Sequence, residues 1–225
     1  MPNIQLNLQT INTRIRQAEI AAQRKAHSVQ LLAVSKTKPS TDIIAAYQAG
    51  QRHFAESYLQ EALIKQKELS HYAISWHFIG PIQSNKTKQI AAHFSWVHSV
   101  DRLKIAQRLN EQRPAHLPPL NICLQINISE ESRKSGFLLT ELSEMLNSIE
   151  KLPRLKVRGV MAIPQPADTE SAQRQPYHQL YQAVQALNKP YLDSFSFGMS
   201  GDLNAAIAEG ATIVRIGSAL FGSRD

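Results

Sequence analysis

The sequence predicts an α/β protein of one domain, a (β/α)8 TIM barrel with an extra helix at its N-terminus. Three observations predict this fold. The chain has 225 residues, of which 43% are hydrophobic, enough to bury the core of one barrel domain. Short apolar runs rich in β-branched residues alternate with segments of helical periodicity, as in proteins built from βα units. Eight such runs occur, which is the number of strands in a closed barrel.

The expected strands are separated by helical segments, so neighbouring strands should run parallel. Their residues are mainly β-branched, aromatic or otherwise apolar, which suits the pleated surface of a sheet. The eight strands are expected at 31–36, 52–57, 76–80, 96–100, 121–128, 157–163, 194–198 and 212–217.

Seven helices are expected between these strands, and another precedes them within residues 1–30 and packs on the barrel. The seven cover 41–49, 58–69, 85–93, 102–112, 140–152, 171–188 and 202–209. Helix-start signals stand at Ser40 or Thr41, at Asp101, and at Thr140 with Glu141, and Gly50 and Gly210 stand where helices should stop. No linker interrupts the pattern, so residues 1–225 should form one domain. An open doubly wound sheet is the alternative that the alternation leaves open.

The composition argues against several classes of protein. No apolar run approaches the ~18 residues of a membrane span, and the polar N-terminus lacks a hydrophobic signal region. We therefore expect a cytoplasmic protein without a membrane partner. The formal charge of +7 comes from dispersed Lys and Arg, so an anionic small ligand is expected rather than nucleic acid. A monomer is expected because no long exposed apolar stripe is apparent.

Several residues of types that often carry chemistry are expected to be structural. Cys123 is the only cysteine and lies inside an apolar run, so we interpret it as a buried, inert thiol. His53, His77 and His98 each stand singly in an expected strand without the spacing of a metal site, and no metal is expected. Lys134, in a polar loop, is interpreted as a solvated charge.

Polar residues collect where the expected strands end, the face on which barrel enzymes carry their sites. Lys36 follows apolar residues of the first strand, so its amine should emerge at the confined mouth of the barrel. Desolvation and nearby cations lower the pKa of a lysine and supply the neutral amine that forms an imine with an aldehyde. The position alone equally allows a lysine that reaches out to solvent.

The last two expected strands each lead into a turn of small and hydroxyl residues. Ser200 follows the seventh strand, and Gly217 and Ser218 follow the eighth. Barrels often bind a phosphate at this place through backbone N–H groups. Ordinary turns use the same residues, so this signal is moderate.

Arg215 alternates with Val214 and Ile216 in the last expected strand, so its side chain should point to the opposite face. A buried arginine needs a partner. Two partners are open: an acidic residue within the barrel, such as Glu56, or a ligand acceptor, such as a pyridine nitrogen.

Seven motifs then occur in a known order and spacing along nearly the whole chain. They are AVSKTKP (33–39), HFAESYLQE (53–61), WHFIGPIQSNK (76–86), QINISEESRKSGF (125–137), RGVMAIP (158–164), FGMSGDLNAAI (197–207) and VRIGSALFG (214–222). In these motifs the sequence resembles the pyridoxal phosphate homeostasis protein family, single-domain relatives of the alanine racemase barrel.

The resemblance implies a pyridoxal 5′-phosphate (PLP) site. It makes Lys36 the residue that holds PLP as a Schiff base, and it makes Ser200, Gly217 and Ser218 phosphate contacts. Arg215 matches the arginine that faces the pyridine nitrogen. Because arginine stays protonated, it would disfavour protonation of that nitrogen and make the cofactor a poorer electron sink.

The chain departs from the family pattern at two positions near this site. The family usually has FGEN where this chain has FAES, and GMSDD where it has GMSGD. Both residues are shorter than their family counterparts, so Ser57, a cofactor-binding candidate, and Gly201 can each contact the cofactor differently or not at all. Neither change touches Lys36.

The resemblance implies a PLP-binding protein of intracellular PLP homeostasis that delivers the cofactor to PLP-dependent apoenzymes, without classical turnover and without catalytic residues. The alternative is a PLP-dependent amino-acid racemase. In racemases with this barrel the second base is a tyrosine from an additional β domain, for which the eight residues after Gly217 leave no room. A third possibility is a phosphate-ligand barrel in which Lys36 is only a charge partner.

Overall fold

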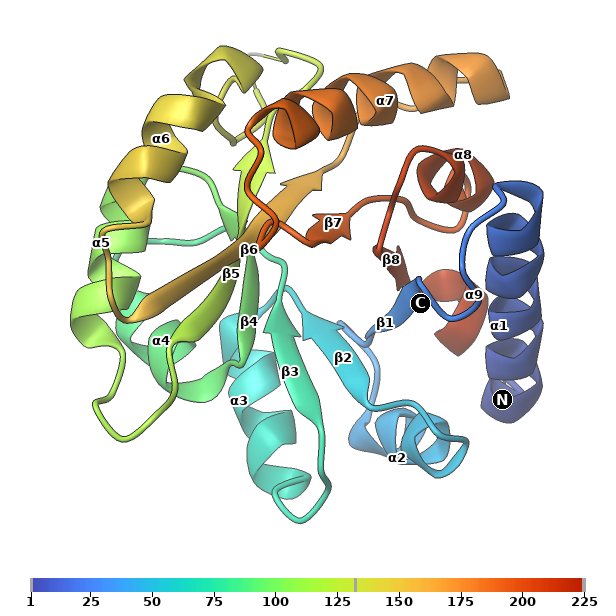
Figure 1. Ribbon diagram of the computed structural model, residues 1–225. Helices are drawn as coiled ribbons and strands as arrows, with labels where there is room; N and C mark the ends of the chain where they lie inside the picture. Colours follow the sequence, from blue (N-terminus) through green and yellow to red (C-terminus); the bar gives the residue numbers. More distant parts are fainter. Residues whose placement is uncertain (1, 132, 224–225) are drawn as a thin grey trace.

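The computed structural model describes residues 2–131 and 133–223, and these form a closed barrel of parallel strands in the order of the chain (Figure 1). Each strand pairs with the next, and β8 pairs with β1. The strands are β1 (Gln30–Val34), β2 (His53–Glu56), β3 (Ser75–Phe78), β4 (Trp96–Val100), β5 (Leu120–Ile126), β6 (Leu155–Ala162), β7 (Ser194–Ser196) and β8 (Ile213–Ile216). The predicted barrel is confirmed, and the open doubly wound sheet is excluded.

Helices surround the strands, and the segments predicted from periodicity are present within a few residues. They are α1 (Ile4–Ala21), α2 (Ser40–Gln48), α3 (Leu59–Glu68), α4 (Thr87–His93), α5 (Leu103–Gln112), α6 (Leu142–Ile149), α7 (Glu170–Ala186) and α8 (Leu203–Ala208). A 3-10 turn, Leu139–Glu141, precedes α6, and a one-turn helix that was not predicted, α9 (Ser218–Phe221), follows β8. The backbone at Gly50 and Gly210 has positive φ, as expected for helix stops.

Some predicted boundaries were wrong for local reasons. The first strand ends at Val34, because the Lys38 N–H donates back to the Ser35 carbonyl (3.1 Å) and closes a turn there. The seventh strand ends at Ser196, since Gly198 has φ +82 and bends the chain.

The proposed helix-start signals were also partly wrong. Helix α2 begins at Ser40 itself, without a side-chain cap, and the Ser40 hydroxyl donates to Glu68 instead (2.5 Å). Asp101 does not cap α5, because the Arg102 guanidinium binds its carboxylate (2.8 Å). At the fifth predicted helix, Glu141 accepts the N–H of Leu138 (2.7 Å) at the start of the 3-10 turn.

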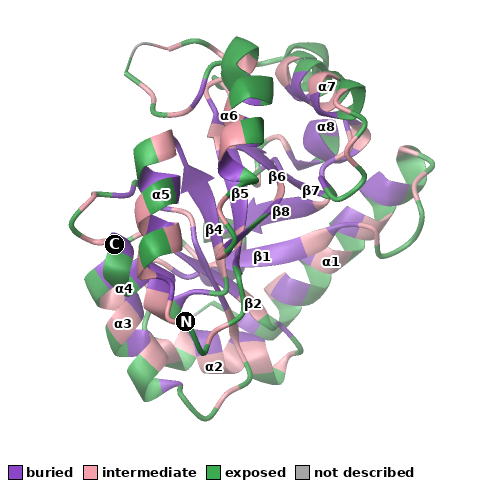
Figure 2. Cartoon of the chain, turned by 60° about the vertical axis from the view of Figure 1, so that its left-hand side comes forward, coloured by how far each residue is buried: buried purple, intermediate pink, exposed green. Residues whose placement is uncertain are grey.

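The hydrophobic core lies mainly between the strands and the helices. Figure 2 shows the strands buried and the helices buried on the sides that face them. Inside the barrel the apolar cluster is small: Leu32, Ala55 and Ile213 are its buried members, with Val34 and Ile79 packed against it. Polar side chains complete the interior, and they include Arg215, which is only 4% exposed. A barrel filled in this way is not held by apolar packing alone.

Helix α1 is fastened to the barrel at two places. It packs beside α8 and α9 (Figure 1), and Arg14 donates to the carbonyl of Ser200 in the β7–α8 loop (2.8 Å). At its other end the buried carboxylate of Glu19 accepts the N–H groups of Val29 (2.8 Å) and His27 (3.1 Å), which lead into β1. The helix therefore supports the loops that follow the last strands.

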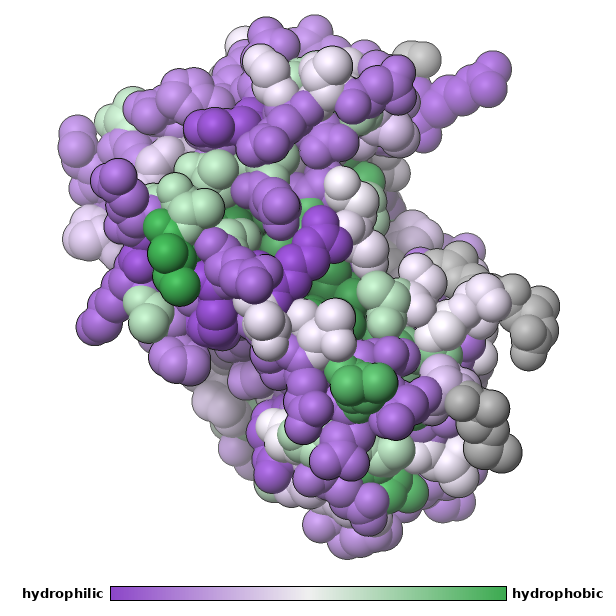
Figure 3. Space-filling model, turned by 90° about the vertical axis from the view of Figure 1, so that its right-hand side faces the viewer, coloured by the Kyte–Doolittle hydropathy of each residue, from purple (hydrophilic) through white to green (hydrophobic). Residues whose placement is uncertain are grey.

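The outer surface carries hydrophobic residues in separate places. On the face in Figure 3 they are interspersed among hydrophilic residues. Large exposed ones include Ile20 and Leu6 on α1. Across residues 2–131 and 133–223, no helix is both long enough and apolar enough to cross a membrane.

We predict that Glu19→Gln destabilises the protein by about 2 kcal/mol at pH 7, a fall in Tm of about 4–8 °C, because charge-assisted hydrogen bonds are lost. Burial alone would raise the pKa of Glu19, but the N–H groups of Val29 and His27 and the Arg16 charge outweigh it and hold that pKa below its usual value. The wild-type advantage should therefore vanish as the pH falls through this lowered pKa. Thermal unfolding at several pH values measures it.

The control is Glu144→Gln, at an exposed glutamate of α6, which should leave Tm unchanged. An advantage of wild type that persisted at low pH would contradict the assignment to the Glu19 charge.

Candidate functional site

Lys36 lies in a turn directly after β1, at the carboxyl ends of the strands. Its side chain is half-buried, and the next residue, Thr37, has φ +66. A β-branched residue rarely adopts positive φ, because its side chain crowds the backbone there. Such strain persists only where surrounding contacts enforce it, and it is concentrated at functional sites.

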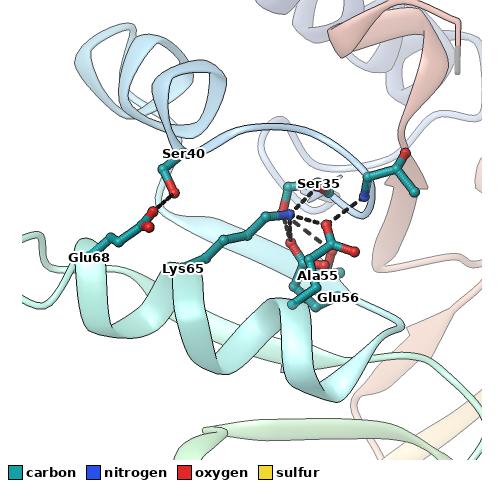
Figure 4. Close-up of polar contacts among 8 residues, drawn as sticks. Ser35, Ser40, Ala55, Glu56, Lys65 and Glu68 are labelled. Carbon is teal, nitrogen blue, oxygen red and sulfur yellow. Dashed lines mark hydrogen bonds and ion pairs between the residues drawn. The ribbon is translucent and has the colours of Figure 1, made fainter. Parts of the chain in front are cut away.

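The contacts that enforce the turn come from α3 and β2 (Figure 4). The amine of Lys65 donates to the Ser35 carbonyl (2.8 Å), to Glu56 Oε1 (2.8 Å) and to Glu61 Oε1 (2.5 Å). Glu61 Oε1 also accepts the N–H of Thr37 (2.6 Å). These three residues, Lys65, Glu56 and Glu61, form a clamp that holds the backbone on both sides of Lys36.

The clamp is a buried charge cluster. Glu56 is fully buried, and its Oε1 also accepts a hydrogen bond from the Ser35 hydroxyl (2.7 Å). Burial raises the pKa of Glu56, and the Lys65 charge acts against that rise. Lys65 is itself only 5% exposed, and a cation buried this deeply requires carboxylates in direct contact.

The sequence analysis missed Lys65 and Glu61, although a signal was present. Lys65 occupies the core-facing stripe of α3, in line with the buried residues Leu59 and Ala62. A lysine at a buried position of a helix destabilises the fold unless a buried carboxylate pairs with it.

Arg215 points into the barrel, as predicted, but the suggested ion pair with Glu56 was wrong, because Lys65 occupies that carboxylate. Its Nη1 donates to the carbonyl and to the hydroxyl of Ser196 (2.9 Å for the latter), and its Nη2 donates to the Ala162 carbonyl (3.0 Å). Burial lowers the pKa of Arg215. Among the described residues its hydrogen-bond partners are neutral and no carboxylate forms an ion pair with it, although the charge of Asp202 acts to raise its pKa. The Arg215 charge therefore lies beneath the mouth without a paired carboxylate.

The two turns predicted to bind phosphate lie next to the turn of Lys36 and to Arg215. A Cβ on Gly217 would lie 3.3 Å from the carbonyl of Val34, the last residue of β1. The Gly198 carbonyl accepts the N–H of Arg215 (3.0 Å), and two residues later Ser200 is half-buried and held by Arg14. Ser218 is exposed at the start of α9.

The two departures from the family pattern differ in their surroundings. Ser57 is half-buried in the bend after β2, and a Cβ on Gly80 would lie 2.1 Å from its carbonyl, so the two backbones pack closely. Gly201 is exposed, and a Cβ there would have no neighbour within 4 Å among the described residues. A longer residue would fit at 201 without displacing anything.

A cavity of about 240 Å³ opens on the same face, between the loops after β3, β4, β5 and β6. Asp101, Gln125 and Lys134 are among its lining residues. The description of Lys134 as a solvated charge was incomplete, since its amine pairs with Glu131 (2.5 Å) and donates to the Ile163 carbonyl (3.2 Å).

The residues expected to be structural are buried. Cys123 is fully buried, as predicted, and burial raises the pKa of its thiol to about 12, which disfavours the reactive thiolate. His77 and His98 are also buried, and His53 is half-buried. Within the described part of the chain no cluster of His, Cys, Asp and Glu could hold a metal ion.

Sequence comparison identifies relatives along the whole chain. The family described as "Alanine racemase, N-terminal domain" matches residues 3–225. The chain is 56% identical over 225 residues to the pyridoxal phosphate homeostasis protein of Pseudomonas aeruginosa, which covers 100% of this chain and 97% of that protein. It is 49% identical over 230 residues to the protein of the same name from Escherichia coli K12, with 100% and 98% covered.

Solved structures show the same barrel. PipY of Synechococcus elongatus, solved with PLP bound, superposes with a TM-score of 0.80 at 36% identity and covers 92% of this chain and 100% of its own. Alanine racemase of Corynebacterium glutamicum superposes with a TM-score of 0.67 at 15% identity over 96% of this chain and 61% of its own, a likeness of fold alone. The chain belongs to the alanine racemase N-terminal domain family and, within it, to the pyridoxal phosphate homeostasis proteins.

Proposed function

We propose that this protein binds pyridoxal 5′-phosphate at the mouth of its barrel, holds it through Lys36, and hands it to PLP-dependent apoenzymes. Two relatives named above are pyridoxal phosphate homeostasis proteins, and PipY was solved with PLP bound, which supports the cofactor. The observation that carries the proposal to this chain is the convergence of the turn of Lys36, the Gly217 turn and Arg215 at one end of the barrel.

The residues offer the hydrogen-bond donors and the positive charge that the cofactor requires. Arg215 offers a positive charge without an ion pair, and its remaining N–H groups can donate to the pyridine nitrogen. The turns at Ser200 and at Gly217 and Ser218 offer backbone N–H groups and hydroxyls to a phosphate. Ser57, at the end of β2, is proposed as a further contact, altered relative to the family.

Lys36 supplies the covalent bond in this proposal. Its Nζ adds to the aldehyde carbon of PLP, water leaves with the aldehyde oxygen, and a C=N bond remains. The clamp of Lys65, Glu56 and Glu61 fixes the backbone that carries this amine, so the amine need not be ordered when the cofactor arrives. When bound, PLP supplies an electron-accepting ring, and an unprotonated ring nitrogen facing Arg215 makes that ring a weak acceptor.

A weak electron acceptor supports a carrier role, because turnover of an amino-acid substrate needs the ring to accept electrons. We place the protein's action in the cytoplasm, as a monomer, without nucleic acid or membrane as a partner. The interspersed hydrophobic residues of Figure 3 support a monomer, because no continuous apolar surface is present on that face. Sedimentation of the PLP-loaded protein determines its oligomeric state.

We predict that the PLP-loaded protein shows a visible imine absorption band, and that Lys36→Ala abolishes it. Borohydride should reduce the bond and fix PLP to Lys36, and mass spectrometry of the digested protein should locate the adduct there. A band that survived in Lys36→Ala, or an adduct found only at Lys134, would contradict the assignment. The absence of an imine band in the wild-type protein would favour the alternative of a phosphate-ligand barrel in which Lys36 is only a charge partner.

We predict that Lys65→Met weakens imine formation about tenfold, because loss of the charge-assisted hydrogen bonds releases the turn around Lys36. Titration of the apoprotein with PLP at the imine band measures this. Lys67→Met is the matched control, because Lys67 is exposed on the same helix and should bind PLP as wild type does. Equal effects of both variants would contradict the clamp.

We predict that the PLP-loaded protein restores the activity of an apo PLP-dependent enzyme while losing its own imine band in proportion. Borohydride-reduced protein is the control, since its cofactor cannot leave. A loaded protein that retained its band would contradict delivery. Sustained racemisation of alanine or another amino acid by the protein itself would contradict the carrier role.

A further inference from the structure

Three histidines inside the barrel have no role in the proposed function. They nevertheless form a hydrogen-bonded chain that leads through Ser196 to Arg215, which does have a role. His53 Nδ1 lies 3.1 Å from His77 Nε2, and His77 Nδ1 lies 2.9 Å from His98 Nε2. His98 Nδ1 lies 2.8 Å from the hydroxyl of Ser196, which accepts a hydrogen bond from Arg215 (2.9 Å). Hydrogen bonds therefore connect the start of β2 to the guanidinium beneath the mouth without a break.

The register of the strands places each successive histidine of this hydrogen-bonded chain closer to the carboxyl ends of the strands. His53 is paired with Ser75, and His77 stands two residues beyond Ser75 on β3. His77 is paired with Trp96, and His98 stands two residues beyond Trp96 on β4. A step of two keeps the side chain on the inward face and raises it by one layer. The chain then crosses to Ser196, the last residue of β7.

The direction of the hydrogen bonds follows from Arg215. A guanidinium can only donate, so the Ser196 oxygen accepts from it. In the described part of the chain, His98 Nδ1 is the acceptor that the contacts offer to the Ser196 hydroxyl hydrogen. His98 must then carry its own hydrogen on Nε2 and donate to His77 Nδ1. By the same argument His77 donates from Nε2 toward His53.

The surroundings keep all three imidazoles neutral, as this direction requires. Burial, followed by the charge of Arg215, lowers the pKa of His98 to about 3. Burial lowers the pKa of His77 well below its usual value and lowers that of His53. Burial, together with the charge of Arg215 at His98, therefore opposes protonation of the three imidazoles.

We propose that Ser196 and His98 are positioning residues for PLP: backed by His77 and His53, they hold the Arg215 guanidinium in one orientation beneath the cofactor ring. This inference rests on the proposed function. The described contacts engage three of the five N–H donors of Arg215, which leaves donors for the ring nitrogen. A buried guanidinium held by carbonyls alone could rotate, whereas an oriented hydroxyl selects one position.

The test compares two serines that touch the same chain. Ser196→Ala removes the hydroxyl between His98 and Arg215, while Ser75→Ala removes one that reaches His77 from the side, at 3.3 Å. We expect Ser196→Ala to weaken PLP binding about tenfold, the effect of losing a hydrogen bond to a charged group. It should also shift the ¹⁵N resonance of the ring nitrogen of bound, labelled PLP. Ser75→Ala should change neither.

A conservative variant separates positioning from folding. Ser196→Thr keeps the hydroxyl and should restore the affinity and the ¹⁵N shift. If Ser196→Ala bound PLP as wild type with an unchanged shift, the positioning role would be overturned while the proposed function stood. The positioning role would also be contradicted if the loss of PLP affinity in all three variants merely paralleled the fall in their Tm values. Failure of the wild-type protein to bind PLP would remove the proposed function and this role together.

The hydrogen-bond direction can be tested without the cofactor. Long-range ¹H–¹⁵N spectra of the apoprotein distinguish the two neutral forms of each imidazole. We expect His77 and His98 to carry hydrogen on Nε2 at pH 7. Hydrogen on Nδ1 of His98 would overturn the chain as described.

Discussion

The site depends on the pairing of β1 with β8, which closes the barrel. Lys36 stands near the start of the sequence, while Arg215, Gly217 and Ser218 stand near its end. The register that pairs Leu32 with Arg215 and Ala33 with Ile216 brings them to one edge. If the sheet stayed open at this point, the lysine and the phosphate turns would lie on opposite outer strands. The covalent and non-covalent contacts proposed for the cofactor therefore become neighbours through a single strand pairing.

Buried charge is handled in two different ways around this edge. Lys65 is surrounded by acceptors that include two carboxylates, so its charge is balanced within the protein and the neighbouring backbone is held rigidly. Arg215 donates to neutral acceptors and forms no ion pair among the described residues, so its charge is hydrogen-bonded without a carboxylate in contact. The first arrangement favours order. The second favours a ligand, because a buried cation without an ion pair gains from a new acceptor.

The sequence predicted the fold well, because strand and helix periodicities and the two helix-stopping glycines are local signals. Strand ends were less predictable, since the turn after Val34 depends on a backbone hydrogen bond from Lys38 to Ser35. The position of Lys36 at the mouth followed from strand counting, but its role came from family resemblance and stays a prediction.

The partners of the buried groups could not be predicted in the same way. The acids that meet Lys65 depend on how α3 packs against β2, which no local sequence pattern reveals. The histidine chain needs the register of β2, β3 and β4, which no single strand reveals. Each histidine viewed alone is an ordinary core residue, and only the hydrogen bonds between the three connect them to Ser196.

The contact between Arg14 and Ser200 spans 186 residues of sequence. During synthesis on the ribosome, α1 emerges long before α8 and α9, the helices it packs against. Its apolar side, formed by Ile4, Leu8, Ile11 and Ile15, then lacks α8 and α9 while most of the chain is made, although α1 also contacts the early helix α2. The nascent protein should carry an exposed amphipathic helix for most of its translation, a surface that chaperones recognise and that other chains can join.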